Sequence, residues 1–194
     1  MTLAEKGLEW TEHYVAAHRF EHFQPEYQKL NRHCRVPTLV HDGRTLIQSS
    51  DIARHLDDVF PGPSLQPEDP VARATMQEWI SEEGEFLFPL IVTMSFNLMM
   101  TLRGGAFGMD VLREWSSRHP DQNRAQDYLR RVSAPPDETA VDAAAAKFRW
   151  HMTYLDETLQ ASGGPWICGE QITLADLSVA PLLDRVESLD RAML

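Results

Sequence analysis

Four prolines divide the chain into two parts of different character. Pro61, Pro63, Pro67 and Pro70 follow one another closely, and proline lacks the amide hydrogen that the interior of a helix or strand needs. Such a segment predicts a stiff linker. Before it, short apolar runs alternate with turn residues, and after it apolar residues recur at helical spacing. We therefore predict a mixed α+β domain over residues 1–61, a linker over 62–70 and an all-helical domain over 71–194.

Charge and apolar content narrow the class of protein. The 194 residues carry a net charge of −11 and are 43% hydrophobic, which is typical of a globular chain. Excess carboxylates repel phosphates and anionic lipids, so nucleic-acid and membrane-surface binding are not expected. The N-terminus has no apolar signal segment. The apolar stretch 86–100 contains Pro89, Thr93, Ser95 and Asn97, too polar a set for a membrane span. A cytoplasmic location is expected.

A β-hairpin is the strongest local prediction in the first part. Residues 36–41 and 44–47 are rich in strand formers, and Asp42-Gly43 between them suits a two-residue hairpin turn. Residues 8–15 alternate at period two and predict a further half-buried strand. Ser49-Ser50-Asp51 offers capping side chains to a helix with Ile52, Leu56 and Val59 or Phe60 on its apolar face, ending at Pro61.

Helices are predicted throughout the second part. One begins near Val71, has a kink at Pro89 and ends at Gly104-Gly105. A helix or helix pair spans residues 110–131, with a break near Pro120. The clearest helix spans residues 137–159, because its apolar residues form one stripe: Val141, Ala144, Phe148, Met152, Leu155 and Leu159.

A capping box predicts where the last helix begins. Thr173 can cap the first turn while Asp176, three residues on, reaches back to the Thr173 amide. Ile172 and Leu177 stand at the positions of a hydrophobic staple. This motif is structural and predicts a buried helix on which folding depends.

Several sequence segments resemble those of cytosolic glutathione transferases, in that family's order and spacing. They are Arg35-Val36-Pro37-Thr38-Leu39-Val40, Leu46-Ile47-Gln48-Ser49-Ser50-Asp51-Ile52, and Gly164-Pro165-Trp166-Ile167-Cys168-Gly169-Glu170 followed by Thr173-Leu174-Ala175-Asp176. The resemblance implies a thioredoxin-like N-terminal domain that binds glutathione. It also implies an all-helical C-terminal domain that walls the pocket for a hydrophobic electrophile.

The resemblance assigns two pairs of residues to glutathione. The Val36-Pro37 bond is expected to be cis, with the Val36 backbone pairing with the cysteinyl part of the ligand. Without the family, a trans proline at an edge strand would be favoured. Gln48 and Ser49 are expected to receive the γ-glutamyl end, and a helix N-terminus at Ser49 suits a carboxylate. The alternative is that Ser49 or Ser50 only caps the helix.

Basic residues near Val36 match positions that hold the glycyl carboxylate in some classes of the family. These are Arg35 and His22, whose alternative is a solvated side chain. His13, His18, His22 and His33 fit no metal-binding motif, so no metal is expected.

The cysteines and the methionine-rich tract have more ordinary interpretations. Cys34, between His33 and Arg35, has a setting that can lower a thiol pKa, but an ordinary or regulatory thiol is favoured, and Cys168 is expected in the core. The tract falls where the family builds its acceptor site, although packing or a dimer interface explains any single residue better. Its members are Phe86, Phe88, Met94, Phe96, Met99, Met100, Phe107 and Met109.

The start of the chain departs from the family pattern. Members begin with a strand and a loop bearing a catalytic Ser, Tyr or Cys, whereas Met1–Leu8 resembles only the end of the first helix. The first strand and most of that helix, about 15 to 20 residues, are therefore expected to be absent, with the catalytic residue upstream of Met1. A fragment or a misplaced start explains this better than a new fold. The chain also stops at Leu194, earlier than usual.

The function implied by the resemblance is attack of the glutathione thiolate on an electrophilic hydrophobic substrate. Conjugation, reductive dehalogenation and aryl-ether cleavage stay open. The competing interpretation is a non-catalytic glutathione-binding or scaffolding protein of the same fold. A homodimer is expected under the family resemblance.

Overall fold

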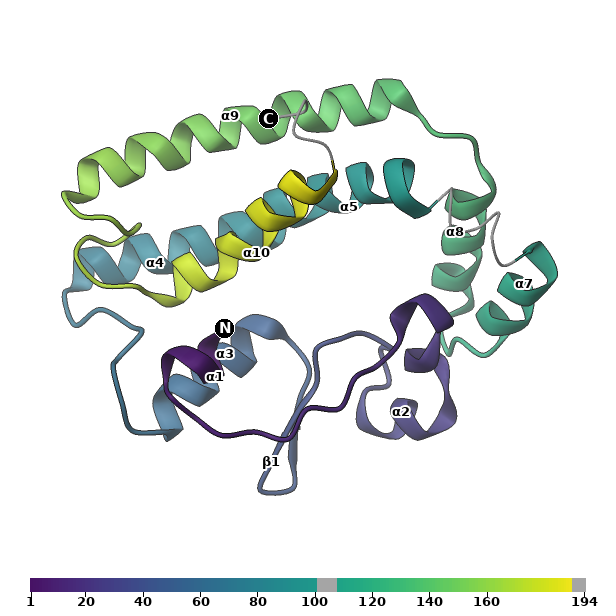
Figure 1. Ribbon diagram of the computed structural model, residues 1–194, viewed down its shortest axis with the longest axis horizontal. Coiled ribbons are helices and arrows are strands. Elements are labelled where there is room, and N and C mark those ends of the chain that lie inside the picture. Colours follow the sequence, from purple (N-terminus) through teal and green to yellow (C-terminus); the bar gives the residue numbers. More distant parts are fainter. Residues whose placement is uncertain (101–107, 190–194) are drawn as a thin grey trace. The chain divides into compact units, whose positions relative to one another are not determined.

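The computed structural model describes residues 1–100 and 108–189 (Figure 1). Contacts within the chain group it into two compact units. The helical unit comprises Met1–Glu9, Ala53–Ser95 and the chain from Asp137 onward. The hairpin unit comprises Trp10–Ile52 and Phe96–Pro136. Both units therefore draw on segments from either side of the proline-rich stretch, while the boundaries at residues 61 and 70 stay a prediction.

The predicted hairpin is confirmed in the hairpin unit. Strand β1 (Leu39–His41) pairs antiparallel with β2 (Arg44–Leu46), with Leu39 opposite Leu46 and His41 opposite Arg44. Asp42 and Gly43 have φ of 49° and 75°. Positive φ at both turn residues is what a type I′ hairpin turn requires.

The strand predicted over residues 8–15 is wrong. That segment forms neither helix nor strand after the short helix α1 (Thr2–Glu5), and the side chains of Trp10 and Tyr14 are 54% and 75% exposed. In the described part of the chain, the sheet contains β1 and β2 alone. A strand needs a neighbour for its backbone hydrogen bonds, and alternation along the sequence does not supply one.

Short helices and two longer ones complete the hairpin unit. They are η1 (Ala17–Arg19), η2 (Glu21–Phe23), α2 (Pro25–Leu30), η4 (Phe96–Met100), α7 (Met109–Ser117) and α8 (Gln122–Ser133). The break predicted near Pro120 is confirmed, since Asp121 caps α8 by accepting from the Arg124 amide at 3.1 Å. A small core holds these elements together: Phe20, Phe23, Cys34, Leu112 and Val132.

Helix α3 (Ser49–Val59) runs from the hairpin unit into the helical unit, as predicted, and buries Leu56. Three further segments then follow one another: α4 (Pro70–Glu82), the π-helix η3 (Glu83–Leu87) and α5 (Phe88–Ser95). The predicted irregularity at Pro89 thus takes the form of a π-helix just before the proline. Proline removes one helical hydrogen bond and displaces the preceding turn. The end predicted at Gly104-Gly105 lies outside the described residues.

The helical unit is built on α9 (Glu138–Ser162) and α10 (Leu174–Leu189). Helix α5 packs against α9, and α10 packs against α4 and α5 (Figure 1). The predicted stripe on α9 faces this core, with Val141, Ala144, Phe148 and Leu155 buried and Met152 and Leu159 half-buried. Gly163 ends α9 with φ of 74°, a left-handed conformation that favours glycine.

The Asp176 half of the predicted capping box is confirmed at the start of α10. The Asp176 carboxylate accepts from the Thr173 amide and from the Thr173 hydroxyl, each at 2.8 Å. It also accepts from the Ile167 amide at 2.9 Å, a bond that ties the preceding loop to the helix.

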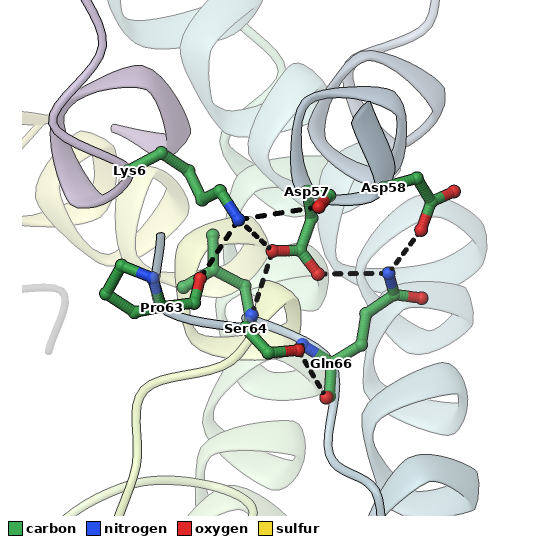
Figure 2. Close-up of polar contacts among 7 residues, drawn as sticks. Lys6, Asp57, Asp58, Pro63, Ser64 and Gln66 are labelled. Carbon is green, nitrogen blue, oxygen red and sulfur yellow. Dashed lines mark hydrogen bonds and ion pairs between the residues drawn. The ribbon is translucent and has the colours of Figure 1, made fainter. Parts of the chain in front are cut away.

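A buried ion pair joins three segments of the helical unit (Figure 2). The Lys6 ammonium donates to Oδ1 of Asp57 at 2.9 Å and to the backbone oxygen of Pro63 at 3.0 Å. Oδ1 of Asp57 also accepts from the Leu65 amide, and Oδ2 accepts from Gln66 Nε2, each at 3.0 Å. The pair therefore fixes the proline-rich segment to α3 and to the start of the chain.

The described residues contain neither a candidate membrane span nor a candidate metal site. No helix there is long and apolar enough to cross a membrane. Within residues 1–100 and 108–189, no group of three or more His, Cys, Asp and Glu side chains is placed to hold a metal ion.

Candidate functional site

The hairpin brings the two predicted glutathione-binding pairs to one end of the sheet. Leu39 and Leu46 face each other across the ladder. Val36 lies three residues before Leu39, and Ser49 lies three residues after Leu46. Both positions therefore lie at the open end of the hairpin, opposite the Asp42-Gly43 turn.

The Val36-Pro37 peptide bond is cis, as the resemblance implies. Side chains from the α2 region hold the residues on either side of it. The Tyr27 hydroxyl donates to the backbone oxygen of Arg35 at 2.6 Å and lies 2.8 Å from Thr38 Oγ1. Asn31, which is buried, donates to the same Arg35 oxygen at 2.7 Å. Val36 itself is 50% exposed and lies on a loop whose flanking residues are held in place.

Gln48 and Ser49 are exposed where α3 begins. The backbone oxygen of Gln48 accepts a hydrogen bond from the Ile52 amide at 2.8 Å, which places Gln48 at the cap position and Ser49 in the first turn. First-turn amides have no partner within a helix, and the helix dipole adds partial positive charge there. The arrangement suits a carboxylate, while the roles of both residues stay predictions.

His22 on η2 is half-buried, and this burial determines the charge of its imidazole. Burial first, then the nearby His119 and Arg124, lower the pKa of His22 to about 4. Its Nδ1 atom is buried without a hydrogen-bond partner in the part of the chain that the structure describes. His22 is therefore neutral near pH 7 and does not supply the cation that its sequence position suggests. Its contribution to ligand binding stays a prediction.

The neutral state of His22 predicts a loss of stability in acid. Between pH 6.5 and about pH 4 the unfolded imidazole binds a proton that the folded one does not. The free energy of unfolding therefore falls as pH is lowered through this range, by about 2 kcal/mol after allowance for partial exposure.

Urea denaturation at pH 7 and pH 4.5 measures this effect. His22→Gln removes the titrating group, so it should lose less stability between the two pH values than the unaltered chain. His13→Gln is the matched control, because His13 is exposed. Equal pH dependence in His22→Gln and the unaltered chain would contradict the assignment. Burial also lowers the pKa of His119, which is still present in His22→Gln. The free energy of unfolding of that variant should therefore keep some dependence on pH.

Two further basic residues, one on α8 and one in the loop before it, lie beside this site, and the sequence did not reveal them. Arg124 on α8 donates from Nη1 to the backbone oxygen of His33 at 3.1 Å. The buried His119 accepts the Asp121 amide at Nδ1 at 2.9 Å, and its ring lies 4.6 Å from that of Phe23. Arg124 and His119 are far from Arg35 along the sequence, so no local pattern predicts that they lie near it in the fold.

Cys34 does not have the activated thiol that its basic neighbours suggest. It is 2% exposed, and burial raises the pKa of its thiol, although Arg124 partly offsets this effect. The favoured interpretation as an ordinary thiol fits this setting.

Cys168 is half-buried against the helical core. Its thiol donates to the backbone oxygen of Ala72 at 3.4 Å. It packs beside the core residues, as the sequence predicts, without being fully enclosed.

The methionine-rich tract divides between environments. Met94 is buried in the helical core, whereas Phe86 and Phe88 are about half exposed. Phe96 and Met109 pack against the core of the hairpin unit. Phe107 and the side chains of Met99 and Met100 lie outside the described residues, and a role of this tract in acceptor binding stays a prediction.

Comparison with known proteins decides the family. The model of the glutathione S-transferase N-terminal domain matches residues 1–59, and that of the glutathione S-transferase C-terminal domain matches residues 116–194. The chain belongs to the glutathione S-transferase family. The predicted fold class, a thioredoxin-like domain followed by an all-α domain, is thereby confirmed.

Individual relatives include enzymes of this family. Protein LigF of Sphingobium sp. (strain NBRC 103272 / SYK-6) is 32% identical over 164 residues, which are 84% of this glutathione S-transferase chain and 58% of LigF. Maleylacetoacetate isomerase of Pseudomonas aeruginosa is 36% identical over 118 residues, 59% of this chain and 54% of the isomerase. The chain thus spans less than two thirds of the length of either relative.

A solved structure resembles nearly the whole chain. The crystal structure of β-etherase LigF from Sphingobium sp. strain SYK-6 matches with a TM-score of 0.84 and 27% identity, covering 94% of this chain and 75% of that chain. Glutathione transferase F2 from Populus trichocarpa, at 21% identity and a TM-score of 0.71 over 98% of this chain and 76% of that one, shares the fold.

Proposed function

We propose that this glutathione S-transferase binds glutathione at the open end of the hairpin. The observation that carries the proposal is the joint placement of the exposed cis Val36-Pro37 bond and the exposed Gln48-Ser49 pair. The Val36 backbone pairs with the cysteinyl part of the tripeptide as an added strand would. Ser49 and Gln48 receive the γ-glutamyl end at the N-terminus of α3, where amides and the helix dipole favour a carboxylate.

The proposed reaction is attack of the glutathione thiolate on an electrophilic carbon of a hydrophobic substrate. A carbon–sulfur bond forms, the bond to the leaving group breaks, and the leaving group departs with its electron pair. An aryl-oxide leaving group then takes a proton from water. Positioning the thiolate beside the electrophile supplies much of the rate. No residue of this chain is assigned to thiolate stabilisation.

Among the reactions open to this class, aryl-ether cleavage is favoured by the likeness to a β-etherase over 94% of the chain. Conjugation and reductive dehalogenation are the other candidates. Incubating the protein with glutathione and an aryl-ether substrate should release a phenol only when glutathione is present. Glutathione binding without turnover of any of the three substrate types would favour the non-catalytic binding protein.

Ser49→Ala tests the proposed site. Loss of a hydrogen bond to a carboxylate should raise the Kd for glutathione about 10-fold in isothermal titration calorimetry. Ser50→Ala is the matched control at the next position of the same helix, and its Kd should change less than twofold. An unchanged Kd in Ser49→Ala would remove Ser49 from the site.

A homodimer is part of the proposal. Large apolar side chains are exposed on the helical unit, with Phe86 at 50%, Phe88 at 51% and Trp150 at 66%. Aromatic side chains are more frequent at protein interfaces than on the rest of the protein surface, and an exposed apolar patch often marks an interface. The proposed cellular location is the cytoplasm, where glutathione is the main thiol pool.

A further inference from the structure

A group of basic residues gathers beside the Val36 loop in a chain whose net charge is −11. Arg35 precedes Val36 and is exposed. Arg124 approaches the same loop from α8, because its Nη1 bonds the His33 backbone oxygen at 3.1 Å. The guanidinium groups of Arg35 and Arg124 are therefore close enough to repel each other at the edge of the proposed glutathione site.

Nearby carboxylates balance the positive charge of Arg35 and Arg124 only in part. Burial, followed by the charge of Arg35, lowers the pKa of the Arg124 guanidinium, and Asp121 offsets these effects only in part. The Asp121 carboxylate is itself engaged at the cap of α8. Two guanidinium groups that repel each other in the free protein gain most from an anion shared between them.

The imidazoles of His119 and His22 lie near these arginines but carry no charge near pH 7. His119 uses Nδ1 as an acceptor for the Asp121 amide, so the neutral ring carries its proton on Nε2. The pKa of His22 is lowered to about 4. The charge available to an anionic ligand thus comes from the two arginines.

We propose that Arg124 binds the glycyl carboxylate of glutathione together with Arg35. This inference rests on the proposed function, because Val36 sets the cysteinyl part of the tripeptide next to Arg35. It assigns part of the glutathione site to α8, outside the thioredoxin-like domain. A guanidinium has five N–H donors, and the bond to His33 uses one of them.

Two ligands and three proteins test this assignment by isothermal titration calorimetry. The ligands are glutathione and its glycyl ethyl ester, which lacks the carboxylate charge. The proteins are the unaltered chain, Arg124→Gln and the control Arg118→Gln. Arg118 is a nearby arginine that pairs with Glu114 at 2.6 Å. Thermal melting of each variant checks that it folds.

The unaltered chain and Arg118→Gln should prefer glutathione over the ester. Arg124→Gln should raise the Kd for glutathione about 10- to 30-fold and change the Kd for the ester less than twofold, so the preference for glutathione shrinks to what Arg35 alone provides. Arg124→Lys keeps the positive charge and should therefore recover part of the preference for glutathione over the ester.

Two results would overturn the assignment, and each is distinct from failure of the proposed function. Arg124→Gln can leave both affinities unchanged, or it can weaken both ligands equally through the displaced His33 loop, and in either case the preference for glutathione stays as it is in the unaltered chain. Failure of the unaltered chain to bind either ligand would instead contradict the proposed function.

Discussion

Replacing Asp57 by alanine is expected to lower the free energy of unfolding by about 3–5 kcal/mol. The side chains of Lys6 and Asp57 are only 2% and 3% exposed. Burial by itself would raise the pKa of the Asp57 carboxyl, but the hydrogen bonds from Lys6, Gln66 and the Leu65 amide hold it below its ordinary value. Asp57→Ala leaves the Lys6 ammonium buried without its counter-ion (Figure 2).

Two further variants separate the charge from the packing at this site. Asp58→Asn is the matched control, because Asp58 is exposed and bonds Gln66 at 2.9 Å, so its effect should stay within about 0.5 kcal/mol. Adding Lys6→Met to Asp57→Ala removes the unpaired charge and should recover part of the lost stability. Urea denaturation measures all of these variants. A loss below 1 kcal/mol in Asp57→Ala would contradict the account of a buried, tightly held pair.

Asp176→Ala is expected to destabilise the protein by a similar amount, about 3–4 kcal/mol. Asp176 is 8% exposed, and its carboxylate accepts from the amides of Thr173 and Ile167 and from the Thr173 hydroxyl. Its removal leaves two amides without an acceptor at a buried helix start. The loop that precedes α10 also loses its tie to the helix.

An exposed cap provides the comparison for Asp176. Asp69 caps α4 by accepting from the Ala72 amide at 2.8 Å, and this bond is exposed. Asp69→Ala should therefore cost only about 1 kcal/mol. Thermal or urea unfolding of both variants gives the ratio directly. Equal losses in the two variants would show that burial and the Ile167 bond add nothing to the capping box.

The sequence predicted those helices and turns that are determined by residues close together along the chain. Asp42-Gly43 specified the hairpin turn, Asp137 and Gly163 bound the long helix α9, and Thr173 with Asp176 marked the start of α10. In each case the residues that determine the structure lie within a few positions of one another. Residues 8–15 show the limit, because their alternation resembles a strand while pairing depends on a partner elsewhere in the chain.

Contacts between residues that are distant along the chain could not be predicted from the sequence. Lys6 and Asp57 lie far apart along the chain, and no local pattern predicts that they meet. The same holds for Arg124, which reaches the His33 loop from α8. The charge of His22 depends on burial by its surroundings, so its sequence position could suggest a cation where the folded protein holds a neutral ring.

Glutathione binding at the open end of the hairpin is tested most directly by NMR. Two-dimensional ¹⁵N–¹H spectra of the labelled protein, recorded during titration with glutathione, report each assigned backbone amide. The account predicts the largest shifts at Val36 and Ser49, saturating at the calorimetric Kd. Saturable binding whose largest shifts fall elsewhere, or no shift at millimolar glutathione, would contradict it.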